Sequence, residues 1–270
     1  MNQPCATEEG HSIRGRFSAA APSYHACARV QAQIADDLME LLSDRPQPYI
    51  ILDIGCGTGL LTERILARYP EARIDALDFS PAMLASAASR LTASPNLRWI
   101  EADARHRDAG ETYDLILSSS SLQWMEPVEE TFNHIVGQLK PGGAFVFSLM
   151  LRETLPELDQ SRRRVAPHKT GDARFRTRDD IEAIFKTLDG DLTTSADRLY
   201  RSAYPSARHF LEEIHQLGVT GGSVSRNGLP LNRTELSRLL TDYESHYAHP
   251  DGGVTAGFQA GFFQFTRNGT

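Results

Sequence analysis

The 270-residue sequence has little of several features that would narrow its class. Its three cysteines, Cys5, Cys27 and Cys56, form no CxxC pair, which argues against a disulfide framework and a zinc ribbon. No apolar run approaches the roughly 18 residues of a membrane helix, and the polar start lacks a secretion signal. A net charge of −7 disfavours non-specific binding to nucleic acid. We therefore expect a cytoplasmic protein that binds neither nucleic acid nor membranes.

The composition is that of a globular chain, with 40% hydrophobic and 23% charged residues. Its length suits one large α/β domain or one domain with an inserted lid. Residues before about 16 look irregular, and a helix is expected at 26–43 because apolar residues recur there at intervals of three and four.

Strand and helix patterns then alternate along the chain. Apolar runs typical of buried strands lie at 49–54, 73–78, 97–101, 113–118 and 143–149. Helical patterns begin near Leu60 and span 81–91 and 127–139. Further on, helices are expected at 178–188, 206–217 and 233–246, with extended segments at 191–201 and 258–266. Such alternation predicts a doubly wound, mostly parallel α/β sheet.

The segment 151–178 interrupts this pattern and is rich in cations. Residues 152–178 hold eight Lys and Arg against four Asp and Glu. We interpret the segment as an inserted helical or loop lid whose cations could dock an acidic partner, the alternative being a solvated loop.

A glycine-rich loop follows the first strand. Asp53 ends that strand, and Gly55, Gly57 and Gly59 precede the next helix. Open α/β sheets bind ligands at this carboxyl edge, and glycines let the backbone approach a ligand closely. A carboxylate suits a cationic amino-acid group better than a pyrophosphate, so Asp53 is a candidate for binding an ammonium group.

Two more acids end the next strands. Asp78 lies 19 residues after Gly59, close to the spacing at which an acid accepts hydrogen bonds from ribose hydroxyls. Asp103 could receive an adenine amino group beside the backbone N–H of Ala104. The alternatives are a helix cap for Asp78 and a solvated turn for Asp103. An adenosine joined to an amino acid indicates S-adenosylmethionine.

The segments LDIGCGTG, ALDFSPAML, EADA, YDLILSSSSLQW and LKPGG resemble the class I S-adenosylmethionine-dependent methyltransferases over about 49–150. The resemblance implies a seven-stranded Rossmann-like sheet and adds Phe79, Met83 and Ser118 to the expected cofactor residues. It divides the chain into a cover segment and helix, a cofactor-binding core, the basic lid, and a C-terminal part that completes the sheet and caps the substrate: 1–45, 46–150, 151–178 and 179–270.

Less specific motifs across most of the chain resemble the malonyl-[acyl-carrier protein] O-methyltransferases of biotin synthesis. They include the Phe17 to Gln31 pattern, Gln123-Trp124 and Arg174-Phe175. This resemblance implies that the acceptor is the free carboxylate of a malonyl thioester on acyl-carrier protein. It places Tyr24, Gln123 and Trp124 at the reacting end, and Phe17 and Arg174 beside the substrate.

Such a reaction needs no general base, because a carboxylate with a pKa near ~4 is already ionised at neutral pH. No metal site is expected, since the histidines near 209–215 and 246–249 lack a completing ligand. Three alternatives stay open: a methyltransferase of small acids such as trans-aconitate, a nicotinamide-dependent dehydrogenase, and a cofactor-binding regulator without catalysis. The dehydrogenase would favour a GxGxxG loop, which is absent here.

Overall fold

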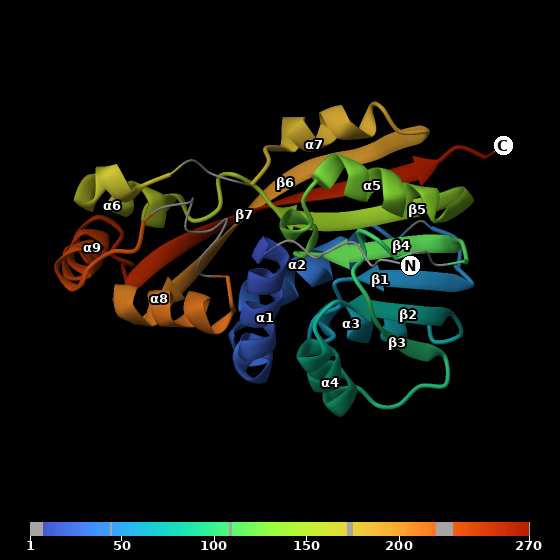
Figure 1. Cartoon of the computed structure of the whole chain (residues 1–270), viewed down its shortest axis with the longest axis horizontal. Helices are drawn as coiled ribbons and strands as arrows, with labels where there is room; N and C mark the ends of the chain where they lie inside the picture. The colour runs from blue at the N-terminus through green and yellow to red at the C-terminus, as the bar shows by residue number, and fades with distance from the viewer. Residues whose placement is uncertain (1–7, 44, 108–109, 172–174, 220–228, 270) are drawn as a thin grey trace.

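A computed structural model describes residues 8–43, 45–107, 110–171, 175–219 and 229–269. Its centre is a seven-stranded sheet in the order β3-β2-β1-β4-β5-β7-β6 (Figure 1). Strands β1 to β5 pair in parallel, and β7 runs antiparallel to both β5 and β6. The predicted doubly wound, mostly parallel sheet is confirmed.

The strands follow the predicted order closely. They are β1 (Ile50–Ile54), β2 (Arg73–Asp78), β3 (Leu97–Glu101), β4 (Tyr113–Ser119), β5 (Leu139–Met150), β6 (Gly190–Tyr204) and β7 (Val254–Arg267). The α-helices are α1 (Glu8–Cys27), α2 (Arg29–Glu40), α3 (Leu60–Arg68), α4 (Pro81–Arg90), α5 (Val128–Gly137), α6 (Pro156–Val165), α7 (Arg178–Phe185), α8 (Ala207–Gln216) and α9 (Arg233–His246). Short 3-10 helices lie at η1 (Leu122–Trp124) and η2 (Pro167–Lys169).

The N-terminal expectation was wrong in two respects. Residues expected to be irregular before about 16 belong to α1, and the helix expected at 26–43 is divided at Ala28. Helix α1 packs against α4 and α8, which lie far away in the sequence. Tertiary packing of this kind stabilises a helix whose own sequence gives a weak signal.

Helices cover both faces of the sheet, as strands buried on two sides require. Ile51 faces a core built with α2, α3 and α8, whereas Leu52 and Ile54 face α5 and α7. The second face holds a phenylalanine cluster from α5, α7, β5 and β7, formed by Phe132, Phe145, Phe147, Phe185, Phe263 and Phe265. No described helix is both long and apolar enough to cross a membrane.

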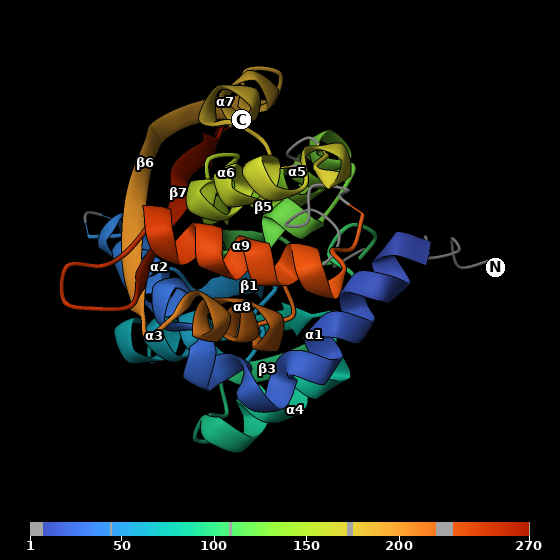
Figure 2. The ribbon, with the colours of Figure 1, turned by 90° about the vertical axis from the view of Figure 1, so that its left-hand side faces the viewer.

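Strands β6 and β7 extend beyond the rest of the sheet. Pairing of β5 with β7 ends at Met150–Ala260, whereas β6 and β7 stay paired as far as Tyr204–Val254. This two-stranded ribbon carries α6, α8 and α9 at one end of the molecule, and α1 stands between them and the parallel strands (Figures 1 and 2). The segment predicted as a lid thus contains α6 and η2, and α6 packs on α9 and β7.

Candidate active site

The glycine loop after β1 makes a tight turn that only small residues permit. Gly55, Gly57 and Gly59 have φ angles of 68°, 54° and 86°, in the left-handed region. The backbone N–H groups of Gly55 and Cys56 both donate to the Leu77 carbonyl, at 2.8 and 3.0 Å. A Cβ atom on Gly55 would lie 2.4 Å from the Ser121 side chain. The turn therefore holds β1, β2 and the segment after β4 close together.

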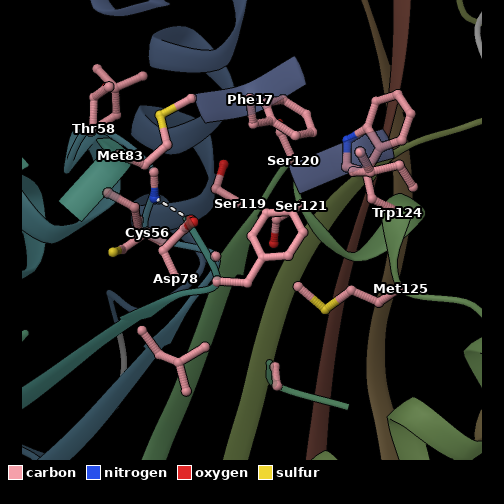
Figure 3. A pocket seen from close by; sticks show the side chains of 18 of the residues that line it. Phe17, Cys56, Thr58, Asp78, Met83, Ser119, Ser120, Ser121, Trp124 and Met125 are labelled. Atoms are coloured by element: carbon pink, nitrogen blue, oxygen red, sulfur yellow. Dashed lines mark hydrogen bonds between the residues drawn. The ribbon is translucent and has the colours of Figure 1, made fainter. Parts of the chain in front are cut away.

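A cavity opens at the carboxyl ends of β1 to β4, and we call it the strand-end cavity (Figure 3). The empty space in it, with the open mouth included, is about 950 Å³. The predicted site residues on its lining are Phe17, Tyr24, Gly55, Gly57, Asp78, Phe79, Met83, Asp103, Ala104 and Trp124. The lining also includes residues that were not predicted from the sequence, among them Cys56, Thr58, Arg105, Ser119, Ser120, Ser121 and Met125.

Asp78 is 6% exposed and ties the glycine loop to the end of β2. Its Oδ2 accepts from the Gly57 N–H at 2.9 Å, and its Oδ1 accepts from the Ser80 N–H at 2.8 Å. Burial raises the pKa of Asp78 to about 6, although these backbone donors favour the charged form. Ser80 is the N-cap of α4, because its hydroxyl accepts from the Met83 N–H. The capping alternative for Asp78 is therefore excluded.

Asp103 reaches the same cavity from the segment after β3. Both of its carboxylate oxygens accept hydrogen bonds from the Arg105 guanidinium, at 2.6–3.1 Å. Burial opposes ionisation, but these bonds hold the pKa of Asp103 below its ordinary value. A ligand amino group would share the Asp103 carboxylate with Arg105. In the sequence, the only indication of this contact is that an arginine follows Asp103 by two residues.

Three predicted cofactor residues lie behind the lining rather than on it. Asp53 is 1% exposed, and its Oδ2 accepts from the Thr62 hydroxyl at 2.6 Å. Its Oδ1 has no partner among the described residues, and burial raises the pKa of Asp53 to about 7. Ser118 is fully buried and donates to the Ile54 carbonyl, so it joins β4 to β1. Gly59 is the N-cap of α3 and faces Leu91.

Helix α1 covers the strand-end cavity with aromatic side chains. The Phe17 ring meets Tyr24 and Trp124 edge-on, with centroids 6.3 and 5.6 Å apart (Figure 3 shows Phe17 and Trp124). The helix is attached by a 2.9 Å hydrogen bond between Ser18 and Ser80. Burial and the nearby Asp78 carboxylate raise the pKa of Tyr24, so its phenol is neutral at neutral pH.

A second cavity continues from the first toward the ribbon, and we call it the aromatic cavity. It encloses about 450 Å³ including its mouth. It shares five residues with the strand-end cavity: Phe17, Tyr24, Gln31, Ser120 and Trp124. Its other walls are Gln123, Met150, Thr154, Leu155, Phe175, Leu217, Val219 and Phe258. No Lys or Arg lines it among the described residues, and the predicted Arg174 lies outside them.

Two buried oxygen atoms near the junction of the cavities have no hydrogen-bond partner in the described part of the chain. They are Ser120 Oγ and Gln123 Oε1, and the Gln123 amide N–H donates to the Ser120 carbonyl at 2.8 Å. Ser120 has a φ of 56°, a strained value for a residue other than glycine. Strain and unpaired polar atoms are features that cluster at functional sites.

Comparison with known proteins agrees with this geometry. A family model described as a methyltransferase domain matches residues 52–145. Malonyl-[acyl-carrier protein] O-methyltransferase 2 of Ilyobacter polytropus is 30% identical over 88% of this chain and 91% of its own length. The Bacillus cereus protein named malonyl-[acyl-carrier protein] O-methyltransferase is 29% identical over 95% of this chain and 97% of its own.

Solved structures share the fold at low identity. The N-methyltransferase NodS of Bradyrhizobium japonicum, bound to S-adenosyl-l-homocysteine, matches 97% of this chain and 99% of its own with a TM-score of 0.56 and 15% identity. A methyltransferase from Haloferax volcanii in complex with the activator Trm112 matches 96% of this chain and 98% of its own with a TM-score of 0.62 and 14% identity.

The residues present fit S-adenosylmethionine as the cofactor. The strand-end cavity offers the buried Asp78 and the half-buried Asp103 at the ends of successive strands, and a glycine loop that leaves room for a ligand. Asp53 is buried behind that loop and does not line the cavity. With this site and a relative 30% identical over nine-tenths of its length, the chain belongs to the malonyl-[acyl-carrier protein] O-methyltransferase family of class I S-adenosylmethionine-dependent methyltransferases.

Proposed function

We propose that this enzyme methylates the free carboxylate of a malonyl thioester on acyl-carrier protein, in the synthesis of the biotin precursor. The observation that carries the proposal is the junction of the two cavities. A site for the methyl donor that is lined by Asp78, Asp103 and Arg105 opens through five shared residues into an acceptor site with no charged residue among its described lining. The names of relatives that match almost the full chain support the same acceptor. We expect the reaction to occur in the cytoplasm.

In this proposal the strand-end cavity holds the cofactor. Asp78 would accept hydrogen bonds from the ribose hydroxyls, and Asp103 with the Ala104 N–H would bind the adenine edge. When bound, S-adenosylmethionine supplies a methyl group on a positively charged sulfur. The rings of Phe17, Tyr24 and Trp124 lie at the junction, where aromatic faces stabilise a cation by about 0.5–2 kcal/mol.

The acceptor needs orientation and a dry environment rather than activation. The aromatic walls exclude water, and fixed geometry contributes up to roughly 7–11 kcal/mol in intramolecular reactions. Gln31 and Ser120 are polar residues shared by both cavities, so their amide and hydroxyl groups can donate hydrogen bonds to a carboxylate there. Tyr24 can donate in the same way, because its raised pKa keeps the phenol protonated.

This chemistry predicts that methyl transfer requires no general base. A carboxylate acceptor stays ionised above a pH of ~5, and the Tyr24 phenol stays neutral. We expect kcat at saturating cofactor to be nearly flat from pH 6.5 to 8.5. A steep titration of kcat in that range, with chemistry limiting, would instead indicate a hydroxyl or amine acceptor.

The direct test uses labelled S-adenosylmethionine and a panel of acceptors. We expect label in malonyl-carrier protein, less in malonyl-coenzyme A, and little in trans-aconitate. Acetyl-carrier protein is the matched control, because it lacks the free carboxylate and should remain unlabelled. Preference for trans-aconitate would support the small-acid alternative. Cofactor binding without methyl transfer to any acceptor would support the regulator.

A further inference from the structure

An exposed surface of leucine and arginine lies at the N-terminal end of α9, and we call it the α9 patch: Leu229, Arg233 and Leu236. Leu229 is 60% exposed and Leu236 is 39% exposed, whereas most large apolar side chains of the described chain are covered. Arg233 is exposed and has no acidic partner among the described residues. Neighbouring apolar and cationic side chains of this kind are typical of protein interfaces.

The apolar side of α9 continues into this patch. Tyr243 and Leu239 are buried, and Leu236 follows them toward the helix start at the spacing of one helix face. Arg233 lies three residues before Leu236 and therefore on the same side. A cation in the first turn of a helix opposes the helix dipole, so Arg233 does not stabilise α9 by charge.

Two cations fix the patch in place. Lys169 Nζ donates to the Pro230 carbonyl at 3.2 Å and pairs with Glu235 at 2.7 Å. The Arg162 guanidinium donates to the carbonyls of Leu229 and Lys169. Among the described residues no acid forms an ion pair with it, and Glu235 and Asp159 act on it only at longer range. Arg162 and Arg233 thus leave a local positive charge beside the two exposed leucines.

Most other cations of the basic segment are neutralised instead. Ion pairs join Arg152 to Asp180, Arg163 to Asp159, Arg164 to Asp242, Arg176 to Glu129 and Arg178 to Asp197. These contacts attach the segment to α5, α7, α9 and β6, or lie within it. The sequence-based expectation of a docking strip along the whole of 152–178 is therefore too broad.

The patch lies at the same end of the molecule as the aromatic cavity. Leu240 of α9 packs in one core with Val219 and Phe258, which line that cavity. Helix α9 crosses this end between α6 and α8, and its N-terminal end is turned toward α1 (Figure 2).

We propose that the α9 patch docks the acyl-carrier protein, an inference that rests on the proposed function. Carrier proteins are acidic, and a chain of net charge −7 would repel such a partner over most of its surface. At the patch, the exposed Arg233 faces carboxylates of the carrier, the half-buried Arg162 adds positive charge beneath it, and Leu229 and Leu236 are covered by the carrier's apolar residues. Docking there brings the thioester arm to the end of the molecule that holds the aromatic cavity.

The test compares two reversals of charge on one helix. Arg233→Glu should raise KM for malonyl-carrier protein about tenfold and weaken its dependence on salt, because rim charges act through association. The kcat/KM for malonyl-coenzyme A should change less than about twofold, since that substrate has no carrier to dock. Arg238→Glu is the matched control, because Arg238 is also exposed and has no acidic partner in the described part of the chain, but lies on the opposite side of α9.

A second variant removes apolar area without changing charge. Leu236→Ser should raise KM for malonyl-carrier protein and leave its salt dependence as in the wild type. Equal effects of Arg233→Glu and Arg238→Glu would overturn the proposal, as would unchanged KM values in both patch variants. If the wild type methylates another acid but not malonyl-carrier protein, the proposed function fails instead. Glutamate suits the first turn of a helix, so Arg233→Glu should fold.

Discussion

The two cavities of the site are built in different ways, although they meet at five shared residues. The strand-end cavity is assembled mainly by the ends of four strands and the turns that follow them, all within 55–125. Its polar groups are carboxylates and backbone donors. The aromatic cavity takes its walls from α1, α2, the turn after β4, η1, β5, the inserted segment, the residues after α8, and β7, and none of its described lining residues is charged.

This difference matches two physical tasks. A charged, hydroxyl-rich cofactor needs hydrogen-bonding groups at fixed positions, which the rigid ends of parallel strands supply. A carboxylate that is already ionised needs mainly orientation and exclusion of water, which packed side chains from distant segments supply. Damage to the first cavity should therefore lower cofactor affinity, and damage to the second should affect the acceptor.

The largest effect is expected at Gly55, where the glycine loop meets the serines after β4. In Gly55→Ala the new Cβ would clash with Ser121 and keep a left-handed φ, at a cost of about 2–5 kcal/mol of unfolding free energy. Cofactor binding should become undetectable. Calorimetric titration with S-adenosylhomocysteine and urea denaturation would measure both effects.

Gly57→Ala is the control for that experiment. Gly57 also has a positive φ, but a Cβ there would meet no described atom within 4 Å, so only about 1–2 kcal/mol of strain is expected. Equal destabilisation by the two substitutions would show that close approach to Ser121 is unimportant.

The next largest effects come from one substitution in each cavity, which should change cofactor affinity and acceptor KM separately. Asp78→Ala should lower affinity for S-adenosylhomocysteine at least about tenfold, because hydrogen bonds to a charged group contribute about 1.5–3 kcal/mol. Phe258→Leu alters only the aromatic cavity, and it should raise acceptor KM while leaving cofactor affinity within about twofold. Wild-type affinity in a folded Asp78→Ala protein would remove Asp78 from the cofactor site.

The contrast also explains which parts could be predicted from the sequence. Glycine, strand and acid motifs are local, so Asp78 and Asp103 could be placed on the strand-end cavity in advance. Ser118 and Ser120 are two residues apart in a run of four serines, and only the turn after β4 decides that Ser120 lines both cavities while Ser118 is buried behind them. Phe258 and Val219 reach the aromatic cavity through long-range packing that no local pattern encodes.

A smaller effect is expected on the pH dependence of stability. Burial raises the pKa of Asp53 to about 7 from an ordinary value near ~4. The folded state therefore retains a proton that the unfolded chain loses, and this contribution to stability is lost as pH rises from about 4 to 7.

Asp53→Asn should remove this decrease of the unfolding free energy with rising pH. The smaller decrease that Asp78 produces between about pH 4 and pH 6 should remain. Urea denaturation of both proteins at several pH values measures the difference. Parallel curves for wild type and variant would mean that Asp53 is ionised in the folded protein.

The smallest effect concerns Ser120, which belongs to both cavities. Its left-handed φ costs about 1–2 kcal/mol, and its buried hydroxyl has no partner among the described residues. Ser120→Gly relieves this strain, but the glycine loses about 0.5–1 kcal/mol more chain entropy on folding. The unfolding free energy should therefore rise by up to about 1.5 kcal/mol.

If the hydroxyl positions the acceptor carboxylate, Ser120→Gly and Ser120→Ala should raise acceptor KM to a similar extent, although only the first relieves the strain. Thermal unfolding and initial rates with malonyl-carrier protein distinguish the two contributions. Ser119→Gly is the matched control: it should destabilise the protein and leave the acceptor KM unchanged, because Ser119 has no positive φ and does not line the aromatic cavity. A Ser120→Gly protein with unchanged KM would show that the strained turn shapes the junction through its backbone alone.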